Sequence, residues 1–380
     1  MRVLNRLPYE RISLNLGVFL LIAMVLFATI VVIPELEFQV PEVRQDFGKT
    51  ERATIRRILE DVTRTGARGP ERYQRLEVEV EGQVTTTEYV QVEQDPRRFD
   101  FNAGDKVLVV SMAGPADETY SIVDYDRDSE LWIFALAFGS LVILIGRWQG
   151  VTSLVGMAAS LLVILRFIIP GIVSGHDPVN ISVFGGAVIL ITSLYLSHGI
   201  NRKTTTALLG TSLSLAITAG LASFALDFVK LSGLADEQAT TLNIITNGGI
   251  NPQGLLLAGM IIGALGVLDD VAVAQSSAVY ELYAANPMLR VRELFARAMN
   301  IGRDHIASTV NTLFLAYAGA ALPLLILFSL QTEPARILVS RDFLATEVIR
   351  TLVGSIGIVA SVPLTTVLAA ASTRLMLRFP

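Results

Sequence analysis

Two adjacent aspartates, Asp269 and Asp270, lie inside an otherwise apolar stretch of this sequence, residues 254–280. The stretch has the length and composition of a membrane-spanning helix. An ionised carboxylate at bilayer depth costs free energy unless it faces the interior of a helix bundle or a water-filled path. The pair is therefore a hypothesis about function, in which a carboxylate carries a proton or binds a cation.

Helical geometry separates the two aspartates. Consecutive residues of an α-helix point about 100° apart, so the two carboxylates cannot both face the same seam and are poorly placed to share one proton. One face of the helix carries small or polar residues at steps of three or four: Gly259, Gly263, Gly266, Asp270, Ala274 and Ser277. Small residues let helices approach closely inside membranes, so this face predicts a packing seam that contains Asp270.

The following span supplies candidate partners for that acid. It enters the membrane near Asp304, which places Asn311 and Thr312 at a depth comparable to that of Asp270. A carboxylate, an amide and the hydroxyls of Ser277 and Thr312 form an oxygen-rich set that suits a proton or a hard cation. A hydrogen bond that clamps two helices would use the same residues, and both interpretations stay open.

The last span contains a second charged feature, Glu347 and Arg350. They are one helical turn apart, which predicts an ion pair within the helix. Further helix-packing positions are expected where small residues recur in the last two spans, at Gly319, Gly354 and Gly357.

Enzyme signatures are missing from the sequence. It has no phosphate-binding Gly-x-x-x-x-Gly-Lys loop, no His-Glu-x-x-His and no Gly-x-Ser-x-Gly. Intramembrane aspartyl proteolysis would need two acids that face each other from different helices, and no second acid is expected at the depth of Asp270. Without cysteine, the chain has no thiol nucleophile and no thiolate metal site. We expect no enzymatic activity.

The composition predicts the elements that position these residues. Of 380 residues, 52% are hydrophobic and the mean hydropathy is +0.54, which indicates a polytopic α-helical membrane protein. The expected fold has about eight transmembrane helices. They are expected at about 14–33, 131–146, 151–169, 179–199, 204–228, 254–280, 306–330 and 344–373.

Charge distribution predicts the orientation. The first apolar block follows Arg2, Arg6 and Arg11 and is too long for a cleaved signal peptide, so it reads as an uncleaved anchor. Basic residues concentrate in the loops that eight spans would place in the cytoplasm, together with both chain termini. The basic amphipathic loop 284–303 is expected to lie on the anionic cytoplasmic leaflet.

A polar region separates the first two expected spans. Five short stretches there alternate polar and apolar residues: 53–59, 76–80, 88–92, 106–110 and 120–125. They predict a small β-rich domain, OB-like in one interpretation. The expected organisation is residues 1–34 as cytoplasmic N-terminus and anchor, 35–128 as an extracytoplasmic β-rich domain, and 129–380 as a seven-helix transmembrane domain.

Several blocks of the sequence resemble a known family. They include Gly263-Ala-Leu-Gly266 with Asp270-Val, Asn300-Ile-Gly302-Arg-Asp304, Asn311-Thr-Leu-Phe-Leu-Ala-Tyr317-Ala-Gly319, Gly354-Ser-Ile-Gly357, and Tyr120-Ser-Ile-Val-Asp124-Tyr125-Asp-Arg127. Over roughly residues 50–375 the chain is similar to the YibE/F-like family of bacterial membrane proteins. The resemblance implies a bacterial cytoplasmic-membrane location and an architecture, but no reaction. It also implies that Asp270 is the recurring acid and that Asp269 is not a fixed member.

The expected function is a transporter or permease for a small polar or ionic solute, coupled to protons or ions, with Asp270 in the path. The alternative is a scaffold or sensor that transports nothing and whose extracytoplasmic domain binds an envelope partner. The expected surroundings are the lipid bilayer and the solute, with a second copy or an envelope protein as further partner classes and no nucleic acid. No cofactor is expected; a bound cation is compatible with the site, and the residues identify no metal.

Overall fold

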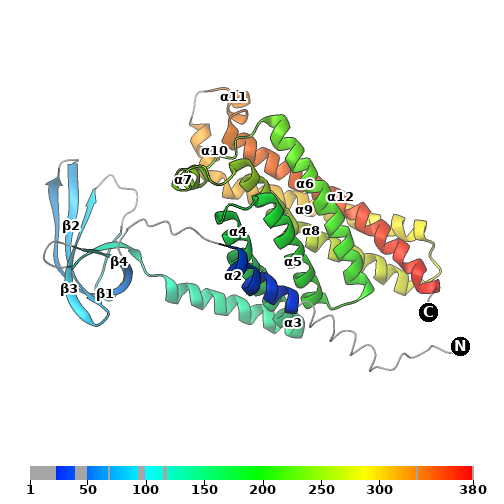
Figure 1. Ribbon diagram of the computed structural model, residues 1–380, viewed down its shortest axis with the longest axis horizontal. Helices are drawn as coiled ribbons and strands as arrows, with labels where there is room; N and C mark the ends of the chain where they lie inside the picture. Colours follow the sequence, from blue (N-terminus) through cyan, green and yellow to red (C-terminus); the bar gives the residue numbers. More distant parts are fainter. Residues whose placement is uncertain are drawn as a thin grey trace. The chain divides into compact units, whose positions relative to one another are not determined.

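The structure is a computed structural model of the chain (Figure 1). It describes residues 23–38, 49–66, 69–92, 99–113, 118–330 and 333–378. The chain forms two compact units. The helical unit comprises Met1–Pro41 and Ile143–Pro380, and the β unit comprises Glu42–Val142. The protein is thus mostly helical with an N-terminal antiparallel β-sheet, which confirms the predicted fold class in this coarse form.

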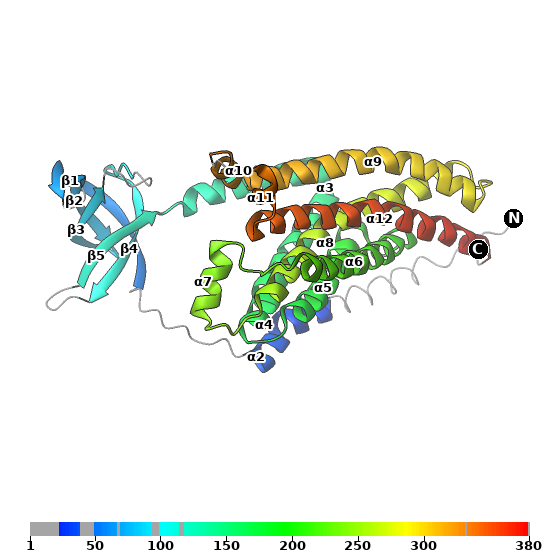
Figure 2. The same ribbon diagram turned by 90° about the horizontal axis from the view of Figure 1, so that it is seen from above.

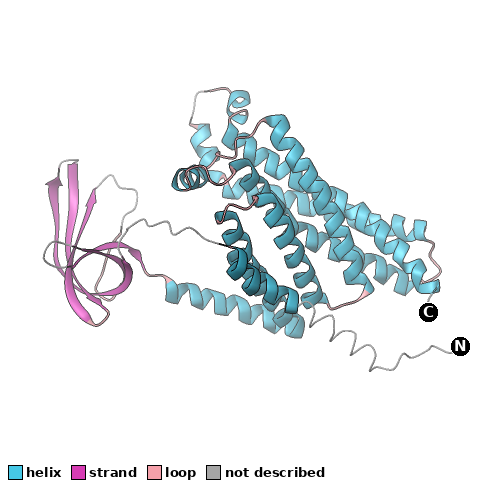
Figure 3. Ribbon diagram, in the orientation of Figure 1, coloured by secondary structure: helices cyan, strands magenta, loops and turns pink. Residues whose placement is uncertain are grey.

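The β unit contains one five-stranded antiparallel sheet (Figure 3). Its strands are β1 (Lys49–Gly66), β2 (Gly69–Val80), β3 (Gln83–Val92), β4 (Lys106–Ala113) and β5 (Glu118–Tyr125). They are ordered β3-β2-β1-β4-β5. The two outer strands also contact each other: the Thr87 hydroxyl of β3 donates to the Tyr120 carbonyl of β5 at 2.5 Å. Each of the five predicted strand segments lies within one of these strands.

Alternating side chains fill the interior of the β unit. Leu76, Val78 and Val80 of β2 point inward at every second position and are buried. They pack with Val107 of β4 and with Phe101, whose side chain is 1% exposed. This period of two is the pattern that the sequence carried, so the core of this unit was predictable from it.

An arginine pairs with two acids on the surface of the β unit. The Arg72 guanidinium donates to Asp61 at 2.7 Å and also pairs with Asp100. Asp61 accepts a further hydrogen bond from the amide of Gln74 at 3.0 Å. The hydrogen bond from Arg72 is the main reason that the pKa of Asp61 lies below its ordinary value, and desolvation opposes it. The same contacts raise the pKa of Arg72.

The helical unit consists mainly of long apolar helices. The helices of the described chain are η1 (Ala28–Val32), α2 (Ile33–Glu37), α3 (Asp128–Val163), η2 (Ile164–Ile168), α4 (Ile169–Val173), α5 (Pro178–His198), α6 (Arg202–Val229), α7 (Glu237–Ile245), α8 (Pro252–Ala285), α9 (Val291–Ala320), α10 (Leu322–Ser329), α11 (Ala335–Val339) and α12 (Asp342–Arg378). Among them α8, which carries both aspartates, packs against α5, α6, α9 and α12 (Figure 2).

The predicted count of eight spans is not confirmed. Among the described residues, five helices are long and apolar enough to cross a membrane, or six if α9 and α10, bent by 66°, form one span. The expected spans 131–146 and 151–169 lie in one helical run, Asp128–Val173, which Arg147 interrupts with φ 50° and ψ −128°. The expected anchor is described only from Ala23, and Ala23–Glu35 is a short apolar helix.

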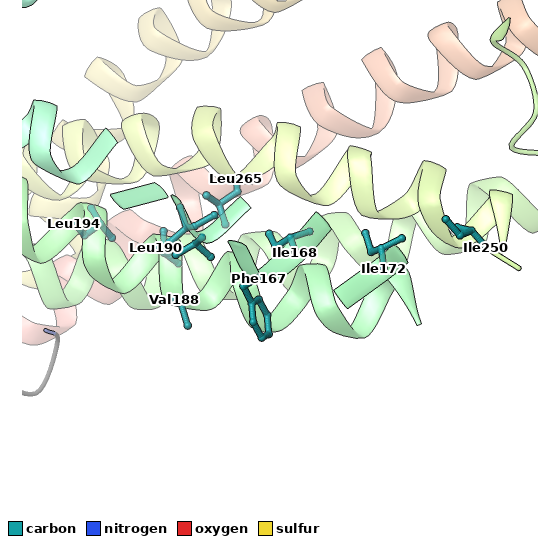
Figure 4. Close-up of a cluster of buried hydrophobic side chains, with 10 residues drawn as sticks. Phe167, Ile168, Ile172, Val188, Leu190, Leu194, Ile250 and Leu265 are labelled. Atoms are coloured by element: carbon teal, nitrogen blue, oxygen red, sulfur yellow. The ribbon is translucent and has the colours of Figure 1, made fainter. Parts of the chain in front are cut away.

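A hydrophobic cluster holds α5 against α8 (Figure 4). It joins Phe167 and Ile168 of η2 to Leu190 and Leu194 of α5 and to Leu265 of α8. At Gly186 of α5, an added Cβ would lie 3.2 Å from Leu265. The absence of a side chain there lets α8 approach α5 closely, and this contact determines which face of α8 is turned inward.

Candidate functional site

Asp269 is the α8 acid that is turned into the helical unit. It lies one helical turn after Leu265, on the face that packs against α5. Its side chain is half-buried, and Oδ1 is buried with no hydrogen-bond partner among the described residues. Ser193 of α5 hydrogen-bonds to the same carboxylate. The contact between α5 and α8 therefore contains a carboxylate with one unused acceptor atom.

A third helix comes close to the same position. At Gly156 of α3, an added Cβ would lie 3.6 Å from Cα of Ser193 and 3.5 Å from Oγ of Ser197. We refer to Asp269, Ser193, Ser197 and Gly156 as the Asp269 junction. It places one carboxylate beside the Ser193 hydroxyl, and α3 contacts α5 at Ser193 and Ser197 through Gly156. A carboxylate and a hydroxyl are oxygen donors able to hold a proton or a small hard cation. Among the described residues, no group of three or more His, Asp or Glu side chains is placed so that it could hold a metal ion.

Asp270 has a different environment from the one predicted. Its side chain is exposed, and no hydrogen bond or ion pair involves it within the described residues. Its charge interacts electrostatically with the neighbouring Asp269 and with His198 at the end of α5. The prediction that Asp270 faces a close-packed seam opposite Asn311 is wrong, because the contact between Leu265 and α5 turns the preceding position, Asp269, inward instead.

The glycine face that was predicted to be a seam is open among the residues that the structure describes. An added Cβ at Gly259, Gly266 or Gly319 would meet no atom within 4 Å, and at Gly263 it would meet only the Tyr317 hydroxyl, at 3.8 Å. These glycines therefore do not mediate close helix packing here. Small size alone did not indicate which face of α8 meets a neighbour.

The other predicted path residues are not brought together. Asn311, Thr312 and Asp304 are exposed on α9. The Thr312 hydroxyl donates to the Ser308 carbonyl of its own helix at 3.0 Å. Ser277 likewise donates to the Val273 carbonyl, at 2.7 Å. These hydroxyls satisfy backbone carbonyls rather than forming a shared site with Asp270.

Glu347 and Arg350 form the ion pair that their spacing predicted. The distance between Arg350 Nη1 and Glu347 Oε1 is 2.7 Å, and both side chains are about three-quarters buried, with 28% and 27% exposed. Arg350 also lines a cavity of about 10 Å³ together with Gly263, Tyr317 and Gly354. Such a volume holds about one water molecule. Gly263 and Gly354 thus border a small void instead of a tight contact.

The close-packed seam of this protein lies between α6 and α12. Gly210 of α6 faces Thr365 of α12, and Gly357 of α12 faces Thr218 of α6, so tightly that a Cβ at either glycine would clash. Only Gly357 of the predicted packing glycines takes part. The seam is lined by hydroxyl side chains that are at most 2% exposed: Thr211, Ser214, Thr218, Ser361 and Thr365. Their spacing was visible in the sequence, but sequence alone does not pair one helix with another.

Sequence reasoning also missed Gln275. Its side chain is 2% exposed, and its amide Nε2 donates to the Ala298 carbonyl of α9 at 3.0 Å and to the Thr366 hydroxyl of α12 at 2.7 Å. Gly302 of α9 provides the space for it, since a Cβ there would lie 3.0 Å from Gln275 Oε1. The signal in the sequence is a glutamine within an apolar run.

Comparison with known families gives a single assignment. The profile described as YibE/F-like protein matches residues 134–374. The chain belongs to the YibE/F-like protein family. The matched region contains the Asp269 junction, Gln275 and the seam between α6 and α12, whereas nearly all of the β unit lies outside it. The sequence resemblance is thus confirmed over the helices, and the block Tyr120–Arg127 precedes the match. No curated protein and no solved structure matches this YibE/F-like chain.

Proposed function

We propose that this YibE/F-like protein is a transporter of the bacterial cytoplasmic membrane that moves a small polar or ionic solute and is driven by a proton or cation gradient. The observation that carries the proposal is the buried Oδ1 of Asp269, which has no partner among the described residues. Helices with the length and hydropathy of membrane spans surround it. A carboxylate in such a place is expensive to retain and is typically kept for proton or ion movement.

In this proposal the Asp269 junction is the coupling site. A proton or cation bound at Asp269 would neutralise the buried charge and so reduce the cost of its desolvation. Ser193 orients the carboxylate by its hydrogen bond. The exposed Asp270 is the next residue, and its charge acts electrostatically on Asp269. The non-helical Arg147 and the 66° bend between α9 and α10 are places where the helices can change direction during transport.

The proposed orientation places both chain termini in the cytoplasm and the β unit outside it. Because the sequence contains no cysteine, single cysteines can report the side of the membrane. We expect a membrane-impermeant thiol reagent to label Thr86→Cys of β3 in intact spheroplasts and to label Arg297→Cys of α9 only after lysis. Labelling of Arg297→Cys in intact spheroplasts would rule out this orientation.

The β unit favours a second function. It is a separate compact unit with its own core. The order β3-β2-β1-β4-β5, with contact between the outer strands, supports an OB-like barrel. Such barrels commonly bind extended polymers on their surface. A role as a scaffold or sensor that binds an envelope partner is therefore the alternative to transport.

Proteoliposomes with an internal pH dye separate the two functions. We expect the purified full chain to dissipate an imposed proton or sodium gradient when a mixture of small polar solutes is added, and protein-free vesicles not to do so. The variant Asp269→Asn keeps the size and most hydrogen bonds of the side chain but removes its charge, so we expect it to lose this flux. Full flux in Asp269→Asn would sink the coupling role, and no flux in the wild type for any solute would favour the scaffold.

A further inference from the structure

The helical unit contains a basic hollow between the beginning of α9 and the end of α12. It has a volume of about 680 Å³ and is lined by Arg290, Val291, Arg292, Glu293, Ala371 and Arg374. We propose that this arginine hollow binds a phosphate-bearing anion. Three arginines and one glutamate surround it, so its lining carries a net positive charge.

The charges of the hollow are available for a ligand. The carboxylate of Glu293 accepts a hydrogen bond from the backbone N–H of Arg290 at 2.8 Å, and this contact caps α9. None of the three arginines forms an ion pair with an acid within the described chain. A guanidinium without a carboxylate partner presents paired N–H donors whose geometry matches phosphate oxygens, and this pairing is stronger and more directional than that of lysine.

The hollow is held in shape by the core next to it. Leu294 and Ala298 of α9 are fully buried against Val279 of α8 and against Ala369 and Ala370 of α12. The two helix ends that carry the arginines are therefore fixed relative to each other before any ligand arrives. Preorganised charges lose less entropy on binding than charges on a mobile loop.

The ligand class follows from charge and size. A phosphate monoester or diester supplies the negative oxygens, and the small apolar walls at Val291 and Ala371 leave room for a neutral group beside it. The phosphate could belong to an anionic lipid headgroup or to a soluble molecule. The lipid source rests on the proposed membrane location, because a headgroup must lie at the level of the hollow; the soluble source does not.

Matched double variants test the hollow in the full-length protein. Arg292→Gln/Arg374→Gln removes two of its charges, whereas Arg297→Gln/Arg303→Gln removes two charges from α9 outside it. The probes are inorganic phosphate, titrated by calorimetry, and phosphatidylglycerol retained from mixed phosphatidylcholine nanodiscs, measured by native mass spectrometry. We expect the hollow variant to bind the effective probe about tenfold or more weakly, and the control to bind like the wild type.

The outcomes separate the two sources. If the wild type and the control retain phosphatidylglycerol and Arg292→Gln/Arg374→Gln does not, the ligand is a lipid headgroup. If the same variant alone loses the binding of inorganic phosphate, the ligand is a soluble molecule. Binding of neither probe by the wild type, or equal losses in both variants, overturns the proposal. Equal melting temperatures show that the variants are folded, and Arg292→Gln alone replaces the double variant if it unfolds. Intact gradient-driven flux with lost anion binding would leave the transport proposal standing.

Discussion

At the scale of single residues, the polar side chains inside the helical unit differ in how many of their hydrogen-bonding atoms have a partner. Asp269 and Gln275 are on the same helix, but one leaves an acceptor unused and the other makes two hydrogen bonds. A buried polar group is tolerated when it is paired and costly when it is not. Gln275 therefore serves stability, whereas Asp269 is the residue whose retention calls for a functional reason.

Removing the Gln275 amide tests whether this residue stabilises the fold. Gln275→Leu removes the hydrogen bonds from Nε2 to the Ala298 carbonyl and to the Thr366 hydroxyl, and we expect a loss of about 1–3 kcal/mol in the free energy of unfolding. Thermal unfolding of the detergent-purified protein measures it. Gln238→Leu on α7, whose side chain is exposed, is the control and should change little. A Gln275→Leu protein as stable as the control would show that the junction of α8, α9 and α12 does not depend on these bonds.

The sequence alone could predict a functional acid in α8 but not which of the two aspartates faces inward. Both have apolar neighbours, and the choice depends on Leu265 meeting Gly186 of α5, a contact between residues far apart in the chain. The family resemblance favoured Asp270, because it compares residue types along the chain. It does not indicate which face of α8 is turned into the protein. The Glu347–Arg350 pair was predictable because both residues lie on one helix.

At the scale of elements, α6 and α12 pack through glycines that are opposed by hydroxyl residues. The seam between α6 and α12 uses Gly210 and Gly357, whereas a Cβ at Gly259 or Gly266 of α8 would meet no atom of the described residues within 4 Å. The presence and type of most elements followed from hydropathy and alternation. The partners of each helix did not, because several helices carry similar small-residue patterns.

Replacing a glycine by alanine distinguishes the seam between α6 and α12, at Gly210, from the open face of α8, at Gly266. At Gly210 the new carbon of Gly210→Ala would lie 3.0 Å from Cβ and 3.2 Å from Cα of Thr365, a backbone atom that cannot rotate away. We expect a destabilisation of about 1–3 kcal/mol from overpacking. Gly266→Ala meets open space and should be neutral or stabilising by about 0.5–1 kcal/mol, since alanine favours the helix. Melting temperatures in the opposite order would place the seam on the other face.

At the scale of the whole molecule, the two units differ in what stabilises them. The β unit has many exposed ion pairs around a small apolar core, and the helical unit has apolar surfaces and few charges inside. Acid should therefore act on the β unit first. The strand segments of this unit were predictable from alternation, whereas the ion pairs across its strands required the register of the sheet.

The Asp61–Arg72 pair makes this expectation specific. Because the folded pKa of Asp61 lies below its ordinary value, its contribution to stability is present above that value and is lost as the pH falls through the folded pKa, below about pH 4. Asp61→Asn should be less stable at neutral pH and less sensitive to acid. Hydrogen exchange of β1 and β2 in the full chain, corrected for intrinsic rates, measures both. Equal acid sensitivity of variant and wild type would contradict the role of this pair.

The central claim is that Asp269, and not Asp270, is the carboxylate that takes up a proton inside the protein. Infrared difference spectra of the reconstituted chain between high and low pH test it most directly, because a protonated carboxyl group in an apolar site has its own C=O band. We predict that the band is present in the wild type and in Asp270→Asn and absent in Asp269→Asn. A band that persists in Asp269→Asn and disappears in Asp270→Asn would contradict the account.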